Sequence, residues 1–177
     1  RALGRLGPIA QEAVPGMELE LTTADLSILE RRLARLETLE KGAKPHERAG
    51  LQQERTIVSR IKESLERDVP VREQELSAEE RKVVTNYHLL TAKPLLAVLN
   101  LGEESVPELT AREERLSMRF GRPGVGFAAL CGKLEMELAE LSEADQQEFR
   151  NSLGLTTPGR ERVIQASYAL LDLVSFL

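Results

Sequence analysis

The stretch Pro94-Leu95-Leu96-Ala97-Val98-Leu99, followed by Asn100-Leu101-Gly102-Glu103, decides the fold class of this chain. A continuous apolar run of this length, closed by a polar turn, is typical of a strand that is covered on both faces, as in a parallel sheet. A second such run, Val125-Gly126-Phe127-Ala128-Ala129-Leu130, is closed by Cys131-Gly132-Lys133-Leu134-Glu135. The alternation of strands and helices from residue 91 onward therefore predicts a parallel α/β sheet.

The helices expected around these strands follow from periodicity and end signals. They cover residues 107–118, a segment through Leu141, a segment from the N-cap Ser142 to Gly154, and a last helix from Pro158 to the end of the chain. Two strands alone do not make a sheet that is buried on both faces. Either the missing strands belong to a part of the protein outside this chain, or these two runs are not strands.

The region before residue 91 has a helical pattern instead. One apolar stripe consists of Leu19, Leu26, Leu29, Leu33, Leu36 and Leu39, and a second of Leu51, Val58, Ile61 and Leu65. Because only Gly42 to Pro45 separates them, the two helices should fold back as an antiparallel hairpin with facing stripes. Each has a narrow apolar seam, which favours an arm projecting into solvent; two ordinary helices of a small bundle are the alternative. Ser77-Ala78-Glu79-Glu80 has the form of a capping box and predicts a further helix to about Leu90.

The resulting fold class is α/β and mostly helical. Its predicted parts are an irregular opening segment over residues 1–16, a helical coiled-coil arm over residues 17–90, and an α/β segment over residues 91–177.

Composition excludes several classes of protein. The net charge of −5 gives no general basic surface for nucleic acid, so DNA is not an expected partner. No apolar run approaches the ~20 residues that span a bilayer, so no membrane association is expected. The single cysteine, Cys131, cannot form an internal disulfide, which favours a reducing cytoplasm. The chain begins with Arg1 and ends in the apolar stretch Leu173-Val174-Ser175-Phe176-Leu177, which favours a piece of a longer protein.

The loops after the two strands are the places to look for chemistry, because ligands of open α/β sheets bind beyond the carboxyl ends of the strands. Taken alone, Asn100 and Glu103 are also compatible with a plain turn at a strand end. Cys131 is compatible with a redox role or with a small residue in place of serine.

The ordered set of motifs resembles the YchF/OBG-like ATPase family of P-loop proteins. Its core is Asn-x-x-Glu after the first strand and Cys-Gly-Lys-x-Glu after the second. The match continues through Glu20-Leu21-Thr22-Thr23-Ala24-Asp25-Leu26, Leu89-Leu90-Thr91-Ala92-Lys93-Pro94 and Arg162-Val163-Ile164-Gln165-Ala166-Ser167-Tyr168. The resemblance implies the carboxyl-side half of a P-loop nucleotide-binding domain, over residues 91–177, with an inserted antiparallel helical arm.

This resemblance also implies a base-binding site made of Asn100, Leu101, Glu103, Cys131, Gly132 and Lys133. Most GTPases of the superfamily have Asn-Lys-x-Asp here, and the Asp accepts two hydrogen bonds from guanine. In this chain Leu101 replaces the Lys and Glu103 replaces the Asp, so we expect ATP to be preferred over GTP. Asn100 would face the purine, Leu101 would pack on it, and Lys133 would lay its alkyl stem over the ring. The backbone N–H groups of Cys131 and Gly132 would approach the base edge.

The sequence holds no G-x-x-x-x-G-K-[ST] phosphate loop. ATP or GTP with Mg²⁺ is thus expected in the intact protein, with no tight binding to this chain alone and no hydrolysis by it. No catalytic residue and no metal ligand is assigned. The arm, over residues 17–68, is the expected surface for a ribosome or another protein, by resemblance to a translation-associated switch. A non-enzymatic helical interaction module that binds no nucleotide is the alternative.

Overall fold

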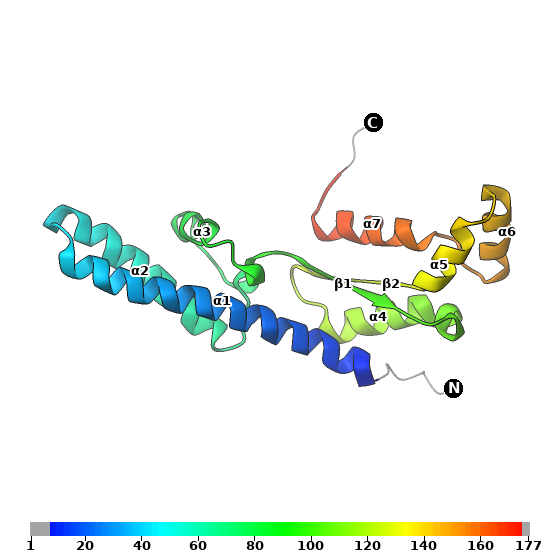
Figure 1. Cartoon of the computed structure of the whole chain (residues 1–177), viewed down its shortest axis with the longest axis horizontal. Coiled ribbons are helices and arrows are strands. Elements are labelled where there is room, and N and C mark those ends of the chain that lie inside the picture. Colours follow the sequence, from blue (N-terminus) through cyan, green and yellow to red (C-terminus); the bar gives the residue numbers. More distant parts are fainter. Residues whose placement is uncertain (1–7, 175–177) are drawn as a thin grey trace. The chain divides into compact units, whose positions relative to one another are not determined.

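The computed structural model describes residues 8–174, which form seven helices and a two-stranded sheet (Figure 1). The elements are α1 (Pro8–Gly42), α2 (Pro45–Leu65), α3 (Ala78–Thr85), β1 (Leu95–Asn100), α4 (Leu109–Phe120), β2 (Val125–Leu130), α5 (Gly132–Ala139), α6 (Glu143–Ser152) and α7 (Gly159–Leu170). Short 3-10 turns lie at Val71–Glu73, Leu90–Ala92 and Glu103–Glu108. The chain divides into a helical unit, Pro15–Lys93, and a sheet unit, which comprises the described residues up to Val14 and those from Pro94 onward.

In the helical unit, α1 and α2 run antiparallel and are joined by two residues, Ala43 and Lys44 (Figure 1). Their predicted apolar stripes meet, since Leu29 and Leu36 of α1 are buried in one cluster with residues of α2. The α2 members of this cluster are Ile57, Val58, Ile61 and Leu65. Leu19 and Leu39, at the two ends of the α1 stripe, remain exposed.

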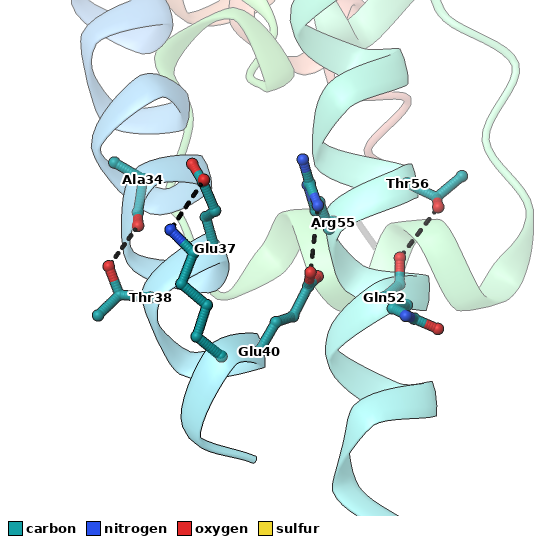
Figure 2. Close-up of polar contacts among 8 residues, drawn as sticks. Ala34, Glu37, Thr38, Glu40, Gln52, Arg55 and Thr56 are labelled. Carbon is teal, nitrogen blue, oxygen red and sulfur yellow. Dashed lines mark hydrogen bonds and ion pairs between the residues drawn. The ribbon is translucent and has the colours of Figure 1, made fainter. Parts of the chain in front are cut away.

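Figure 2 shows polar contacts in the part of α1 and α2 that lies near their connecting residues. The guanidinium of Arg55 on α2 reaches across to the carboxylate of Glu40 on α1, at 3.1 Å. Along α1 itself, Lys41 pairs with Glu37 at 3.2 Å. These contacts lie near the surface and contribute on the order of 0–1 kcal/mol each to stability. The buried apolar side chains therefore contribute most to the packing of α1 against α2.

The core of the helical unit extends beyond the helix pair. Val71, Val84 and Leu89 are buried in the same cluster as the two stripes. The segment after α2 therefore supplies part of the core, and the coiled-coil arm predicted over residues 17–90 is not confirmed. The capping box of α3 is present, since Ser77 Oγ accepts from the N–H of Glu80 and the Ser77 N–H donates to the Glu80 carboxylate.

A buried carboxylate ties the end of this segment to α1. Asp25 has no exposed surface, and its two oxygens accept from the N–H groups of Leu90 at 2.8 Å and Thr91 at 2.7 Å. Thr91 is itself buried, and its Oγ1 accepts from the Val71 N–H at 3.4 Å. A carboxylate that receives two backbone donors fixes the turn at residues 90–92 with little freedom.

The sheet unit is built on two parallel strands, which pair from Leu95↔Val125 to Asn100↔Leu130. Side chains alternate between the two faces of each strand. On one face, Ala97 and Phe127 pack with Leu116 of α4. On the other face α7 lies close, because a Cβ at Gly126 would come within 3.5 Å of the Leu170 side chain. The predicted strand over residues 125–130 is confirmed, and the first strand begins and ends one residue later than predicted.

A second carboxylate supports the outer side of β2. Glu113 on α4 accepts from the backbone N–H of Ala129 at 2.9 Å and from the Arg162 guanidinium on α7 at 2.8 Å. The helices on the two faces are thus joined through the edge of the strand.

The segment predicted as irregular over residues 1–16 is corrected where the structure describes it. Residues 8–16 belong to α1, despite Pro15 and Gly16, and residues 1–7 lie outside the described part. Val14 explains the difference, because it is buried against Ala97 and Leu116 of the sheet unit. Burial of this side chain offsets the helix-breaking tendency of its neighbours, which a local pattern cannot reveal.

Several helix ends also differ from prediction. The helix after Ser77 ends at Thr85 and not near Leu90, and His88 follows with a φ of 51°. The last helix ends at Leu170, although the prediction carried it to the end of the chain; residues 175–177 lie outside the described part. Helix α4 starts at Leu109, with Pro107 in the preceding 3-10 turn. After the first of these helices the chain turns so that the N–H groups of Leu90 and Thr91 reach Asp25, a long-range contact that the sequence pattern does not encode.

Among residues 8–174, no helix is both long enough and apolar enough to cross a lipid bilayer.

Candidate functional site

The loops after β1 and β2 meet at one edge of the sheet, because the strands are parallel neighbours. Leu101 continues the pairing past the end of β1, and its N–H donates to the Leu130 carbonyl at 2.9 Å. The predicted base site comprises Asn100 at the end of β1, residues of the loop that follows it, and Cys131 to Lys133 at the start of α5. The structure therefore brings the six together from two segments about thirty positions apart in the sequence.

Asn100 joins the two loops directly. Its side-chain Oδ1 accepts a hydrogen bond from the Gly132 N–H at 2.9 Å. A Cβ at position 132 would lie 3.2 Å from the same oxygen, so glycine allows the close approach. This bond uses Oδ1 as its acceptor and leaves the amide Nδ2 of Asn100 as a donor that Gly132 does not engage.

Cys131 and Leu101 face the protein more than solvent. Cys131 is the N-cap residue of α5, and its side chain is buried with Val106, Leu134 and Leu138. Leu101 is half-buried and packs against the same cluster. The buried position of Cys131 fits the interpretation of a small residue in place of serine. The structure thus leaves only the backbone of Cys131 beside the loop edge.

Glu103 and Lys133 form an ion pair across the two loops. The Lys133 Nζ lies 2.6 Å from the Glu103 Oε1, and a weaker contact of 3.8 Å joins Lys133 to Glu137 on its own helix. The hydrogen bond to Glu103 raises the pKa of the Lys133 ammonium above its ordinary value, with a smaller contribution from Glu137. Sequence reasoning placed both residues in the site and did not foresee that they would be partners.

A supporting carboxylate behind the site was also missed. Glu135 Oε1 accepts from the N–H of Gly159, the first residue of α7, at 2.9 Å. Its other oxygen contacts the largely buried Arg150 at 3.5 Å. A Cβ at Gly159 would lie 3.0 Å from Glu135, so this approach also depends on a glycine. The signal was present in the sequence, since Glu135 closes the Cys-Gly-Lys-x-Glu motif.

A separate polar cluster lies in the helical unit, beside a cavity of about 480 Å³ between α2 and α3. Glu54 accepts from Arg32 and from the hydroxyl of Tyr87. Burial, and then the bond to Glu54, raises the pKa of Tyr87 to about 12. These residues come from three different segments of the unit, so the cluster joins the segments. No sequence motif predicts it.

Comparison with known proteins identifies relatives over nearly the whole chain, although no protein-family model matches it. The chain is 34% identical over 175 residues to the ribosome-binding ATPase YchF of Bacillus subtilis, an alignment that covers 98% of the chain and 46% of the relative. It is 30% identical over 173 residues to the protein of the same name from Haemophilus influenzae, with the same coverage. The chain thus spans about half the length of these curated relatives.

The fold has a counterpart among solved structures. The YchF GTPase of Schizosaccharomyces pombe superposes with a TM-score of 0.75 at 22% sequence identity, over 97% of this chain and 46% of that one. The fold of the described residues is therefore that of the corresponding part of a YchF protein. Together with the sequence identity, this confirms the resemblance drawn from the motifs: over the segment that it spans, the chain belongs to the YchF family.

Proposed function

We propose that this chain supplies the purine-recognition part of an ATP- or GTP-binding and hydrolysing switch protein, together with a helical arm that binds a partner. The observation that carries the proposal is the Asn100–Gly132 hydrogen bond, which holds the loops after two parallel strands together at the carboxyl edge of the sheet. Ligands of open α/β sheets bind at this edge. The names of the relatives, ribosome-binding ATPases, support the same function and do not favour a helical module without nucleotide binding.

In this proposal the base site consists of Asn100, Leu101, Glu103, Cys131, Gly132 and Lys133. Asn100 offers its amide donor, Leu101 supplies apolar surface, and the backbone between Cys131 and Gly132 lies at the base edge. The alkyl stem of Lys133 covers the ring while its ammonium is held by Glu103.

We propose that this site prefers ATP over GTP. Guanine presents N1–H and N2–H donors that need an acceptor. Glu103 replaces the Asp that accepts both of them in most GTPases, so this matched acceptor is lost. Leaving those donors unpaired in a bound complex costs about 1–3 kcal/mol.

The helical arm, over residues 17–68, is proposed to contact the ribosome or another protein. Its tip presents the exposed Leu39 beside a hollow of about 750 Å³, which is lined mainly by apolar and small side chains such as Ala43 and Leu51. A protein that acts on the ribosome works in the cytoplasm, which is the proposed location.

Hydrolysis is proposed for the intact protein and not for this chain alone. Phosphoryl transfer depends on a phosphate loop and on Mg²⁺ that neutralises charge on the phosphates. The sequence has no phosphate-loop motif, and the six residues named above suit a purine base rather than a metal-bound triphosphate. In the assembled site, bound Mg²⁺ would stabilise the phosphates while this chain orients the base. Purified chain that turned over ATP above background would contradict this part.

The test of base recognition is the double substitution Leu101→Lys with Glu103→Asp, in a YchF protein that carries this segment together with a phosphate loop. It restores the Asn-Lys-x-Asp pattern, so the ratio of GTP to ATP affinity in calorimetric titration should rise by about tenfold or more. Glu104→Asp, which shortens the neighbouring exposed carboxylate, is the control and should leave the ratio unchanged. An unchanged ratio in the double variant would remove these positions from base recognition.

A further inference from the structure

The Glu103–Lys133 pair connects the two loops at their outermost point. Glu103 opens the 3-10 turn after β1, and Lys133 is the second residue of α5, after β2. Closer to the sheet, backbone and amide contacts at Leu101 and Asn100 already join the same loops. The ion pair is therefore the last of three successive links and the one formed entirely by side chains.

Lys133 has two carboxylates within reach and lies much closer to the one across the loops. Its Nζ is 2.6 Å from Glu103 and 3.8 Å from Glu137, although Glu137 is one helical turn away on the same helix. An i,i+4 pair is the usual local partner for a lysine. The preference for Glu103 follows from the tertiary arrangement of the loops, and the raised pKa of Lys133 has the same first cause.

The pair also determines what Glu103 can offer a ligand. A carboxylate bonded to an ammonium has part of its accepting capacity occupied, and its charge is compensated. A base that presents two adjacent donors, as guanine does at N1 and N2, would have to compete with Lys133 for it. Adenine carries no such pair of donors and makes no such demand.

We propose that the Glu103–Lys133 ion pair is a latch that holds the two base loops together and withholds the Glu103 carboxylate from guanine. Lys133 thereby acts as a positioning residue that sets purine preference through Glu103. This inference rests on the proposed function for its ligand, and on the structure alone for the link between the loops.

The latch is reversible, since both side chains are substantially exposed, 71% for Lys133 and 48% for Glu103. Exposed pairs are weak and are screened by salt. Loss of the ion pair should therefore change the amide hydrogen exchange of the two loops, and the relative affinity for guanine and adenine nucleotides, by about two- to fivefold. It should not abolish folding.

The first experiment uses the 177-residue chain without ligand. Amide hydrogen exchange of Gly132 and Leu101 is followed by NMR at low and high salt. Lys133→Met keeps an unbranched four-atom stem and removes the ammonium, so both amides should exchange about two- to fivefold faster, and the dependence on salt should disappear. Glu137→Gln is the matched control, because it removes the carboxylate that Lys133 approaches within its own helix, and it should leave both amides as in the wild type.

Reversing the pair provides a rescue. Glu103→Lys alone places two cations together and should speed exchange further, whereas Glu103→Lys with Lys133→Glu should restore slow, salt-dependent exchange. Exchange that is the same in wild type and Lys133→Met, or that responds equally to Glu137→Gln, would overturn the latch.

The second experiment titrates a YchF protein that carries this segment together with a phosphate loop, with ATP and with GTP, by calorimetry. Lys133→Met should raise the affinity for GTP relative to ATP by about two- to fivefold, because the Glu103 carboxylate is released. If Leu101→Lys with Glu103→Asp leaves the ratio unchanged, the proposed purine site is wrong, while the ligand-free exchange still reports on the link. If that double variant changes the ratio and Lys133→Met does not, the purine site stands and the latch does not set its preference.

Discussion

The helical unit and the sheet unit differ in how completely they bury their apolar side chains. The helical unit closes its core with side chains from α1, α2 and the segment that follows them, and Leu29, Leu36, Val58 and Ile61 are all but inaccessible. The sheet unit surrounds a two-stranded sheet with α4 on one face and α7 on the other, and Val98 in the middle of β1 is still 44% exposed. Helices satisfy their backbone bonds internally, whereas a parallel strand needs neighbours on both sides. Contacts within the helical unit therefore bury its core side chains, whereas contacts within the sheet unit leave part of its sheet exposed.

The largest test of this comparison is a pair of core truncations, Leu36→Ala in the helical unit and Leu116→Ala in the sheet unit. Both side chains have no exposed surface. Each variant should lose about 3–4 kcal/mol in free energy of unfolding, and Leu36→Ala should lose more, because the smaller cluster around Leu116 can relax into the cavity. Peptide-resolved hydrogen exchange would show which unit loses protection. A larger loss from Leu116→Ala would contradict the view that the helical unit has the better closed core.

A smaller effect is expected from the buried carboxylate that joins residues 90–92 to α1. Asp25→Ala removes the acceptor of two buried N–H groups, at Leu90 and Thr91, and should lower the free energy of unfolding by about 2–3 kcal/mol. Asp25→Asn keeps one acceptor oxygen and should lose less. Urea unfolding measures both. If Asp25→Ala had the stability of the wild type, the 3-10 turn at Leu90–Ala92 would not depend on this contact.

The smallest effect concerns pH and the Tyr87 hydroxyl. Its pKa in the folded chain is about 12, against about 10 for an unfolded tyrosine. The folded state then holds the proton more tightly, so the stabilisation is complete below pH 10 and is lost as the pH rises through 12. Tyr87→Phe should remove this part of the pH dependence of unfolding.

The chain has two tyrosines, so a Tyr168→Phe background isolates Tyr87 for titration by tyrosinate absorbance. In this background, Glu54→Gln should lower the apparent pKa, because the carboxylate that favours the protonated hydroxyl is lost. A folded-state titration of Tyr87 near pH 10 would contradict the role given to the cluster.

Much of the sheet unit could be predicted because its strands are short apolar runs with polar ends. The run Val125–Leu130 was located without error, and the run before Asn100 within one residue. The proximity of the six candidate residues could be predicted, since parallel neighbours bring their carboxyl ends together, whereas their role in base binding is what the family resemblance implies. The contacts among the six could not be predicted, because the distance between Glu103 and Lys133 depends on how the two loops bend.

The helical unit teaches the complementary lesson. Its stripes predicted which residues of α1 and α2 face each other, but the burial of Val71, Val84 and Leu89 in the same core could not be foreseen. A capping box at Ser77 gives the start of a helix reliably, because its bonds are local. The end of that helix depends on where the chain must turn to reach Asp25, which is a long-range requirement.

Local signals in the sequence were sufficient to predict the two strands, the helix starts with capping residues, the apolar seam of α1 and α2, and the loop motifs that carry the family resemblance. The three-dimensional structure was needed to establish that residues 8–16 are helical, that Asp25 accepts two distant backbone donors, and that Lys133 pairs with Glu103 and not chiefly with Glu137. The physical reason is the same in each case. Burial and charge pairing between segments far apart in the chain outweigh preferences that act over one or two helical turns.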